Sequence, residues 1–178
     1  MDIYMPMSTT KRHNRITSTL YSRIINFIEN GELNALKEEC ALVYWGSKKL
    51  PTGFNLVDIT KIDNTEHFIE EVMYELEYVQ PDFMLFKNNP YIENKKQTRT
   101  AGLPDLIVEV WSESNSANDR AFLQNLYATS DITEHWYIEQ DSNEVICYVG
   151  QNRINNQSLA EVLVTRDRLK FDLRYLAI

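Results

Sequence analysis

The chain has 178 residues, of which 43% are hydrophobic and 25% are charged, and its net charge is −8. A chain of this length can bury a sizeable core without disulfides or structural metals, and we expect a single domain over residues 1–178. No apolar run approaches the ~20 residues that cross a bilayer, and the N-terminus lacks the basic and apolar regions of a signal peptide, so we expect a cytoplasmic protein. The acidic balance argues against a strong, nonspecific nucleic-acid binder, whose electrostatic footprint is basic.

The first expected element is a helix over residues 9–30, where apolar residues recur at helical spacing. Ser8, Thr9 or Thr10 would cap it, and Asn30 followed by glycine would end it. The further expected elements are a strand at 41–45, an irregular loop at 46–65, strands at 72–78 and 82–86, a polar segment at 88–103, a strand at 104–111, a helix at 117–130, a hairpin of 134–139 with 145–149, and short strands at 160–164 and 169–173. This order predicts a mixed α/β or α+β domain with a central sheet. The polar segment is long for a simple connection, which marks it as functional or mobile.

Two of the apolar strands carry acids. In the run PDLIVEVWS at residues 104–112, apolar residues alternate with a set that includes Glu109, so the carboxylate lies mid-strand on the face opposite to the valines. A carboxylate buried there is costly unless something pairs with it, and a metal ion is one such partner. Asp82 opens the other apolar strand. Two acids on two rigid strands are what a magnesium site requires.

Each acid also has a structural interpretation. Asp82 could satisfy the amides of a turn at the entrance to its strand, and Asp105 after a proline is more often a turn or cap residue than a ligand. Glu109 is harder to explain in this way, because acids between valines are rare without a partner. His13 is expected on a polar face of the first helix, and Tyr127 in the core. The three histidines show no metal-ligand spacing, so zinc is not expected.

Several short motifs taken together resemble one nuclease family. They are Gln80-Pro-Asp82, Pro104-Asp105, Glu109-Val-Trp-Ser112, Asp119, Tyr127-Ala128 and Glu134-His-Trp136, with a weaker match at Met5-Pro-Met-Ser8 and His13. On these residues the chain resembles the Uma-type "putative restriction endonuclease" family of the PD-(D/E)XK nuclease superfamily, most clearly over residues 80–150. The resemblance implies a restriction-endonuclease-like core, a mixed α+β fold in which a central mixed β-sheet is flanked by helices.

The resemblance also implies an activity, the metal-dependent hydrolysis of DNA as an endonuclease. Asp82 and Glu109 match the family's two carboxylates, which would hold Mg²⁺ or Mn²⁺ and act in catalysis. The family's usual lysine, four residues after the position of Asp119, is Leu123 here, and leucine can neither position a water nor offset phosphate charge. Gln124, the next residue, could orient a water by hydrogen bonding and is the third candidate catalytic residue.

The polar segment supplies candidates for DNA binding, namely Lys95, Lys96 and Arg99, although these residues could equally form an ordinary solvated face. Two functions therefore stay open. One is an endonuclease, weakened by the loss of the lysine, and the other is a catalytically inactive nuclease-fold module that binds nucleic acid or a protein partner. DNA is the expected partner, no membrane is expected, and a homodimer is left open.

Overall fold

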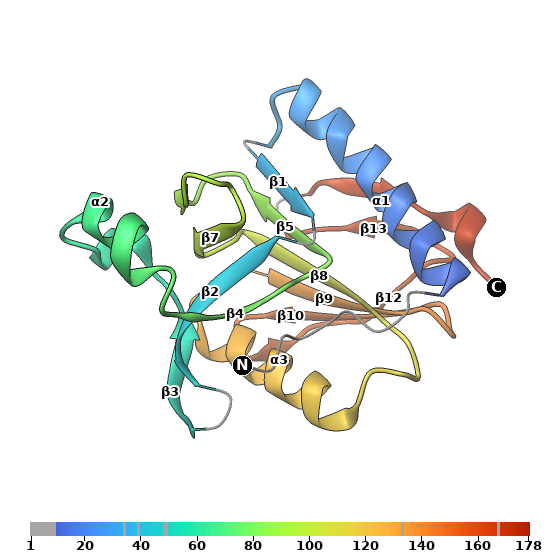
Figure 1. Cartoon of the computed structure of the whole chain (residues 1–178). Coiled ribbons are helices and arrows are strands. Elements are labelled where there is room, and N and C mark those ends of the chain that lie inside the picture. The colour runs from blue at the N-terminus through green and yellow to red at the C-terminus, as the bar shows by residue number, and fades with distance from the viewer. Residues whose placement is uncertain (1–9, 34, 39, 48–49, 133, 167) are drawn as a thin grey trace.

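The computed structural model describes residues 10–33, 35–38, 40–47, 50–132, 134–166 and 168–178. In this part of the chain the largest sheet has the strand order β1-β5-β8-β9-β10-β11, with β12 paired to β10 (Figure 1). Its strands are β1 (Ala35–Glu38), β5 (Phe83–Phe86), β8 (Leu106–Trp111), β9 (Glu134–Glu139), β10 (Glu144–Val149), β11 (Asn152–Arg153) and β12 (Gln157–Ser158). β8 runs antiparallel to β5 and parallel to β9, so the sheet is mixed.

A second sheet has the order β3-β2-β7-β6, with β4 paired to β2. Its strands are β2 (Ala41–Ser47), β3 (Leu50–Leu56), β4 (Glu77–Val79), β6 (Tyr91–Glu93) and β7 (Arg99–Gly102). Near the C-terminus, β13 (Val162–Val164) and β14 (Lys170–Asp172) form a separate antiparallel pair. The short helical elements are η1 (Ile59–Lys61), α2 (Thr65–His67), the π-helical turn η2 (Phe68–Val72) and η3 (Arg174–Leu176).

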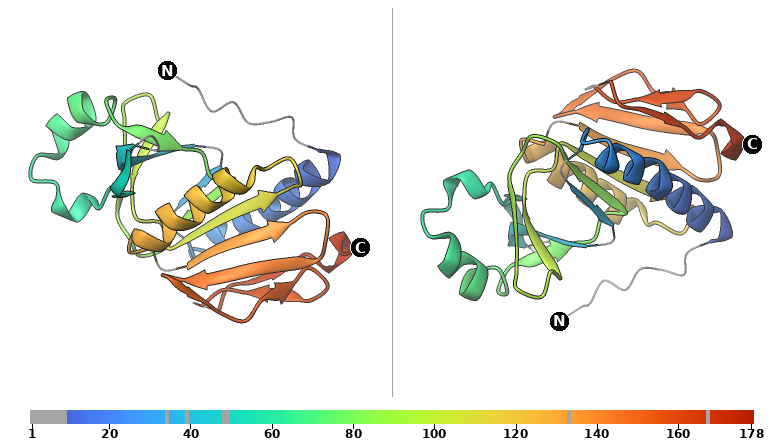
Figure 2. Two further views of the ribbon diagram at one scale, coloured as in Figure 1. Left: turned by 90° about the horizontal axis from the view of Figure 1, so that it is seen from below. Right: turned by 90° about the horizontal axis from the view of Figure 1, so that it is seen from above.

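Two long helices cover opposite faces of the main sheet, α1 (Lys11–Glu29) and α3 (Ala117–Thr129) (Figures 1 and 2). The hydroxyl of Thr10 caps α1, and the hydroxyl of Ser116 caps α3, each by accepting a backbone N–H three residues on. The buried stripe of α1 is Ile16, Leu20 and Ile24, which belong to the same core as the α1-facing residues of β5 and β8. The apolar period of each helix thus determines which face it presents to the sheet.

All six residues of β8 are buried, because both faces of this strand are covered. Leu106, Val108 and Val110 belong to the core beneath α1. Ile107 and Trp111 belong to a second core, which α3 and the second sheet enclose. Glu109 therefore lies opposite to the valines, as expected, but the face that it occupies is a second interior and not an open surface.

The buried hydroxyl of Ser130 joins the second sheet to the end of α3. It accepts a hydrogen bond from the N–H of Leu56 at 2.7 Å and donates one to the carbonyl of Leu126 at 2.5 Å. Leu126 is fully buried in the second core. The second sheet and α3 consequently form one layer over the face of the main sheet that carries Glu109.

Three sequence expectations in the second sheet are wrong. The segment 72–78 is not one strand, because η2 and a turn occupy most of it before β4 begins. The guanidinium of Arg99 bonds to the carbonyls of Met73, Tyr74 and Leu76, which satisfies backbone groups that a turn leaves open. The expected loop at 46–65 contains β3, and the polar segment at 88–103 forms the β6–β7 hairpin.

The other expectations are confirmed at the level of elements. The helices at 11–29 and 117–129, the strands β2, β5 and β8, the β9–β10 hairpin and the β13–β14 pair all lie where the pattern predicts them. Thr10 is the cap of α1, whereas Ser8 and Thr9 lie outside the described residues. Among the helices that the structure describes, none combines the length and hydropathy that crossing a lipid bilayer requires.

A buried histidine lies on β9, beneath the second core. His135 is 1% exposed, its Nε2 is 2.9 Å from the carbonyl oxygen of Gly150, and its Nδ1 is 2.7 Å from the hydroxyl of Tyr137. Because a carbonyl can only accept, Nε2 carries the proton and Nδ1 accepts from Tyr137. Burial lowers the pKa of His135 from 6.5 to about 4.

This histidine should make stability fall as the pH falls. Between pH 6.5 and about 4 the unfolded chain takes up a proton at His135 that the folded chain does not, so stability is lost on acidification, by at most about 3 kcal/mol. Urea denaturation at pH 7, 5.5 and 4 should therefore show a smaller acid loss in His135→Gln than in the wild type. His67→Gln, at an exposed site, should keep the wild-type dependence, and equal acid losses in all three proteins would contradict the expectation.

Candidate active site

Asp82 and Glu109 lie on neighbouring strands of the main sheet. Glu109 is the fourth residue of β8, and Asp82 directly precedes β5. The antiparallel register pairs Phe83 with Val108, so one residue further back Asp82 lies opposite Glu109. Residues that lie opposite each other on antiparallel strands project from the same face of the sheet. The two acids therefore share the face that α3 covers.

The carboxylate of Asp82 is held on both oxygens. Its Oδ2 accepts a hydrogen bond from the N–H of Val110 at 2.6 Å. Its Oδ1 lies 3.2 Å from Nε2 of His13, and the side chains of His13 and Asp82 are 12% and 16% exposed. Asp82 is thus tied to β8 through one oxygen and to the first turn of α1 through the other, and the contact keeps limited access to solvent.

The carboxylate of Glu109 is held by α3. Glu109 is 6% exposed, and its Oε1 accepts a hydrogen bond from the hydroxyl of Tyr127 at 2.6 Å. Burial raises the pKa of Glu109 well above its ordinary value, and the negative charge of Asp82 raises it further, whereas hydrogen bonds from Tyr127 and from the Asp82 backbone act in the opposite direction. These influences require the two acids to be close neighbours. Burial and the charge of Glu109 also raise the pKa of Tyr127, which keeps its phenol protonated as a donor.

The same face of α3 carries Leu123. Residues four apart on a helix share a face, so Leu123 lies one turn before Tyr127 on the face of α3 that carries the donor to Glu109. Its side chain is half-buried against the second core. The one basic residue of α3, Arg120, bonds instead to Glu139 and to the carbonyl of Ser112. The helix face that carries Tyr127 therefore has an apolar side chain, and no cation, one turn before the donor to Glu109.

Gln124 follows on the same helix and is half-buried. Within the residues that the structure describes, its side chain has no hydrogen bond to Asp82 or Glu109. The structure thus brings Asp82 and Glu109 together and places Gln124 on the helix above them. The role of Gln124 in orienting a water stays a prediction.

The donor chemistry of the acid pair fits a hard divalent cation. The charge of Asp82 disfavours the ionised form of Glu109, and a divalent ion would remove this conflict because it favours both ionised carboxylates. In the described part of the chain, no three His, Cys, Asp or Glu side chains are arranged to hold an ion jointly. The only side-chain ligands from the described residues would therefore be the two carboxylates, and most of the other positions would go to water and substrate oxygens, as is usual for magnesium.

The residues expected to bind nucleic acid lie on the β6–β7 hairpin of the second sheet, Lys95 and Lys96 in its turn and Arg99 at the start of β7. Lys95 forms an ion pair with the carboxylate of Glu70. Nη1 of Arg99 is 2.7 Å from the carbonyl oxygen of Met73, and the guanidinium packs over the rings of Tyr74 and Tyr78. Lys96 is exposed. For these three residues, DNA binding stays a prediction.

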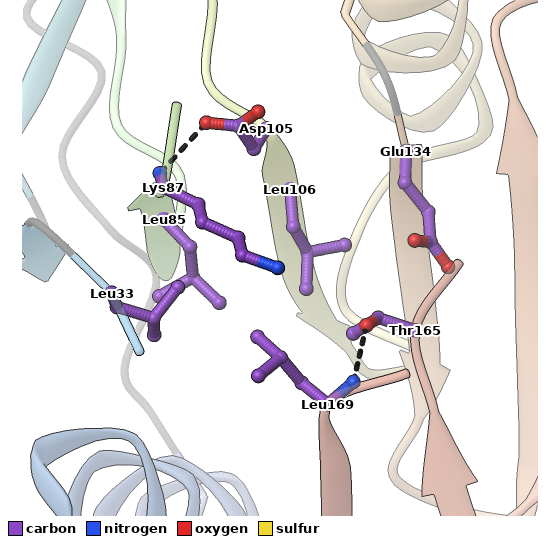
Figure 3. Close-up of a pocket in the computed structure, with 8 residues that line it drawn as sticks. All are labelled: Leu33, Leu85, Lys87, Asp105, Leu106, Glu134, Thr165 and Leu169. Carbon is purple, nitrogen blue, oxygen red and sulfur yellow. Dashed lines mark hydrogen bonds between the residues drawn. The ribbon is translucent and has the colours of Figure 1, made fainter. Parts of the chain in front are cut away.

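A small cavity of about 20 Å³ lies at the other end of β8, where Asp105 precedes the strand and Leu106 begins it (Figure 3). Oδ2 of Asp105 accepts hydrogen bonds from three consecutive backbone N–H groups, those of Lys87, Asn88 and Asn89. This geometry confirms the structural interpretation of Asp105 as a turn residue. The cavity has room for about one water molecule, so it is not a substrate site.

Two residues without a predicted role, His13 and Tyr127, lie at the acid pair. The expectation that His13 lies on a polar face is wrong, because its side chain is 12% exposed and contacts Asp82. The sequence does contain a sign that His13 is buried, because His13 precedes Ile16 by three residues and so continues the buried stripe of α1. Tyr127 is a core residue as expected, but a buried tyrosine hydroxyl usually needs a partner.

The comparisons with known proteins concern the family and the fold of the chain. The family model described as "Uma2: Putative restriction endonuclease" matches residues 61–173. A solved crystal structure, that of "a putative nuclease belonging to DUF820 from Anabaena variabilis ATCC 29413", superimposes with a TM-score of 0.65 at 14% sequence identity. The superposition covers 99% of this chain and 87% of that one, and at this identity it establishes the fold alone. No curated protein matches the chain.

Replacing the buried acid with its amide should stabilise the metal-free protein. Glu109→Gln removes a buried charge and its repulsion with Asp82, while the amide oxygen can still accept from Tyr127, so we expect a gain of roughly 0.5–2 kcal/mol. Because the folded pKa of Glu109 is raised, this group contributes stability at low pH that is lost as the pH rises through that pKa. The gain should thus be larger at pH 8 than at pH 5.

Urea denaturation in the presence of EDTA at both pH values measures this gain. Glu29→Gln, at an exposed position of α1, is the matched control and should change stability little. A loss of stability in Glu109→Gln at both pH values would show that the acid pair is not strained.

Proposed function

The chain belongs to the Uma2 family, whose model matches more than half of it, and from this premise we propose that it is a metal-dependent DNA endonuclease that hydrolyses phosphodiester bonds. The observation that carries the proposal is the neighbouring pair Asp82 and Glu109 on β5 and β8, with burial and mutual repulsion raising the pKa of Glu109. Strongly perturbed carboxyl groups with a specific charge partner are typical of functional sites.

In this proposal Asp82, Glu109 and the carbonyl of Val110 hold Mg²⁺ or Mn²⁺, which when bound supplies an activated water and offsets the charge at the phosphorus. The protein's own part is to hold these oxygens in place. The Val110 N–H fixes Oδ2 of Asp82, and the Tyr127 hydroxyl fixes Oε1 of Glu109. Gln124 on α3 is the proposed residue that orients the attacking water by a hydrogen bond.

DNA would approach over the second sheet, where Lys95, Lys96 and Arg99 are the proposed phosphate contacts. Lys96 is exposed and makes no ion pair in the described part of the chain, so it can bind phosphate without breaking an existing contact. Lys95 would exchange its bond to Glu70 for one to phosphate. A homodimer and a cytoplasmic location stay predictions.

A second function is favoured by one specific observation, the apolar side chain of Leu123 on the face of α3 that also carries Tyr127, the donor to Glu109. Without a cation there, the site lacks a group that would offset charge on the substrate. The alternative is therefore a catalytically inactive nuclease-fold module that binds nucleic acid or a protein partner. Metal binding by itself would not separate the two functions, because an inactive module could keep the acid pair, so cleavage is the property that separates them.

Cleavage of supercoiled plasmid tests the first function. We expect the wild type to nick plasmid in Mn²⁺ and more slowly in Mg²⁺, and Asp82→Asn and Glu109→Gln to lose nicking by at least ~10²-fold, as is usual when a group essential to charge stabilisation is removed. Glu29→Gln should cleave like the wild type. Equal nicking by wild type and Glu109→Gln would point to a contaminant and sink the proposal. Mn²⁺ binding without nicking would favour the inactive module.

Leu123→Lys should raise nicking. A lysine at this position would project from the face of α3 that carries Tyr127, and we expect its ammonium to contact the substrate phosphate. Removing a single preorganised donor from an oxyanion hole costs about 2.7–4 kcal/mol, which indicates how large the effect of one added group can be. Because Leu123 is only half-buried, the lysine stem can cover the same apolar surface while its head stays solvated. Leu123→Met is the control for packing. A lower melting temperature with no gain in nicking would mean that this face does not reach the substrate.

A further inference from the structure

We propose that His13 and Tyr127 are positioning residues, each of which holds one acid of the pair in the rotamer that binds a divalent ion. The inference rests on the proposed function in one respect, that Asp82 and Glu109 are the ligands. Neither positioning residue would bind the ion itself. Each would act by a hydrogen bond to a ligand, and such supporting contacts typically change metal affinity by ~10–100-fold.

Tyr127 provides the contact that fixes the position of the Glu109 carboxylate. A glutamate has three rotatable side-chain bonds, so its carboxylate needs an external contact to stay in one place. The hydroxyl of Tyr127 supplies it at 2.6 Å, and both residues are buried, so water is poorly placed to substitute for the phenol. The ring is fixed in turn by the second core, which contains its neighbour Leu126. The donor is therefore rigid before any ion arrives.

His13 provides the corresponding contact for the carboxylate of Asp82. The N–H of Val110 already fixes Oδ2, and Nε2 of His13 lies 3.2 Å from the remaining oxygen, Oδ1. With both oxygens held, the carboxylate plane cannot turn away from Glu109. Asp82 precedes its strand by one residue, so the β-ladder alone does not restrain it. The contact from α1 supplies a restraint that the sheet lacks.

The first turn of α1 is itself anchored so that His13 stays in position. The hydroxyl of Thr10 accepts the N–H of His13 at 3.0 Å and lies 2.6 Å from Oε1 of Gln140. Arg12 donates to the backbone carbonyl of Gln140, and Gln140 is 1% exposed, just beyond the end of β9. The N–H of Gln140 bonds to the carbonyl of Trp111, the residue that ends β8. The anchor thus connects His13 to the strand that carries Glu109.

Mn²⁺ affinity, measured by the EPR signal of free Mn²⁺ at a temperature where every variant is folded, tests the Tyr127 half. We expect Tyr127→Phe to weaken Mn²⁺ binding by ~10–100-fold. Tyr137→Phe is the matched control, because Tyr137 is also fully buried on this face of the sheet but its hydroxyl bonds to His135. We expect it to change Mn²⁺ affinity less than about threefold, even where it lowers the melting temperature as much. Equal effects on affinity would mean that Tyr127 has a structural role only.

For His13 the matched pair is His13→Gln and His13→Leu. Glutamine can place an N–H near the position of Nε2, whereas leucine only fills the space. We expect His13→Leu to weaken Mn²⁺ binding by ~10–100-fold and His13→Gln to restore part of the loss. His67→Leu, at an exposed site on α2, should bind Mn²⁺ like the wild type. Equal affinities of His13→Leu and His13→Gln for Mn²⁺ would overturn this half of the proposal.

The results separate this inference from the proposed function. Wild-type binding of Mn²⁺ with unchanged affinity in Tyr127→Phe and His13→Leu would overturn the inference and leave the proposed function standing. Weaker binding in these variants, together with no nicking by the wild type, would support the inference and favour the inactive module. A wild type that binds no Mn²⁺ would overturn both.

Discussion

The repulsion between the carboxylates of Asp82 and Glu109 is the constraint around which the other layers of the structure are arranged. Two like charges in a poorly solvated site repel each other, and the negative charge of Asp82 accordingly raises the pKa of Glu109. Burial makes the ionised form of Glu109 still less favourable, because it removes the water that would solvate the carboxylate. The protein places a donor on each acid, the Val110 N–H on Asp82 and the Tyr127 hydroxyl on Glu109. These donors offset part of the repulsion, and the pKa of Glu109 nevertheless stays raised.

This requirement explains why β8 is covered on both faces. Tyr127 reaches Glu109 from α3, the crossover helix that links β8 to the parallel strand β9 (Figure 2). His13 reaches Asp82 from α1, the helix on the other face of the sheet. A sheet covered on one face could carry the two acids but could not surround them with donors from two directions. The hydroxyl of Ser130 bonds the second sheet to the end of α3, and this contact helps to keep α3 packed over the sheet face that carries Glu109.

The local pattern of apolar and polar residues predicts the strands and helices that build the site. Alternation around Glu109 predicts β8, and the apolar period of residues 11–29 predicts α1. The second sheet was largely missed, because its short strands depend on pairing partners distant in sequence and on the Arg99 contacts that hold the preceding turn. Non-local pairing of this kind leaves little periodic signal in a short segment.

The candidate site likewise contains residues that the sequence predicts and residues that it does not. Glu109 stands out in the sequence, because an acid within an apolar strand is unusual wherever the strand lies, whereas Asp82 at a strand entrance also has a structural interpretation and is assigned to the same site mainly by the family resemblance. Their donors could not be assigned, because His13 is 69 residues from Asp82 in the chain and only the packing of α1 brings the two together. The helix period could have placed His13 on the buried stripe, but it could not have named the partner. Tyr127 differs, since a βαβ crossover returns over its own strand and brings its helix near Glu109.

In the proposed function, metal binding and cleavage would depend on partly different residues. The contacts that hold the two carboxylates come from His13, from the backbone N–H groups of Val110 and Asp82, and from the hydroxyl of Tyr127, and none of them involves position 123. A leucine at that position would therefore leave the proposed ligands and their supports intact, while it supplies no charge to the substrate. The acid pair would then be able to bind a divalent ion whether or not the protein cleaves DNA. Cleavage would require the ion and would depend, in addition, on the group at position 123.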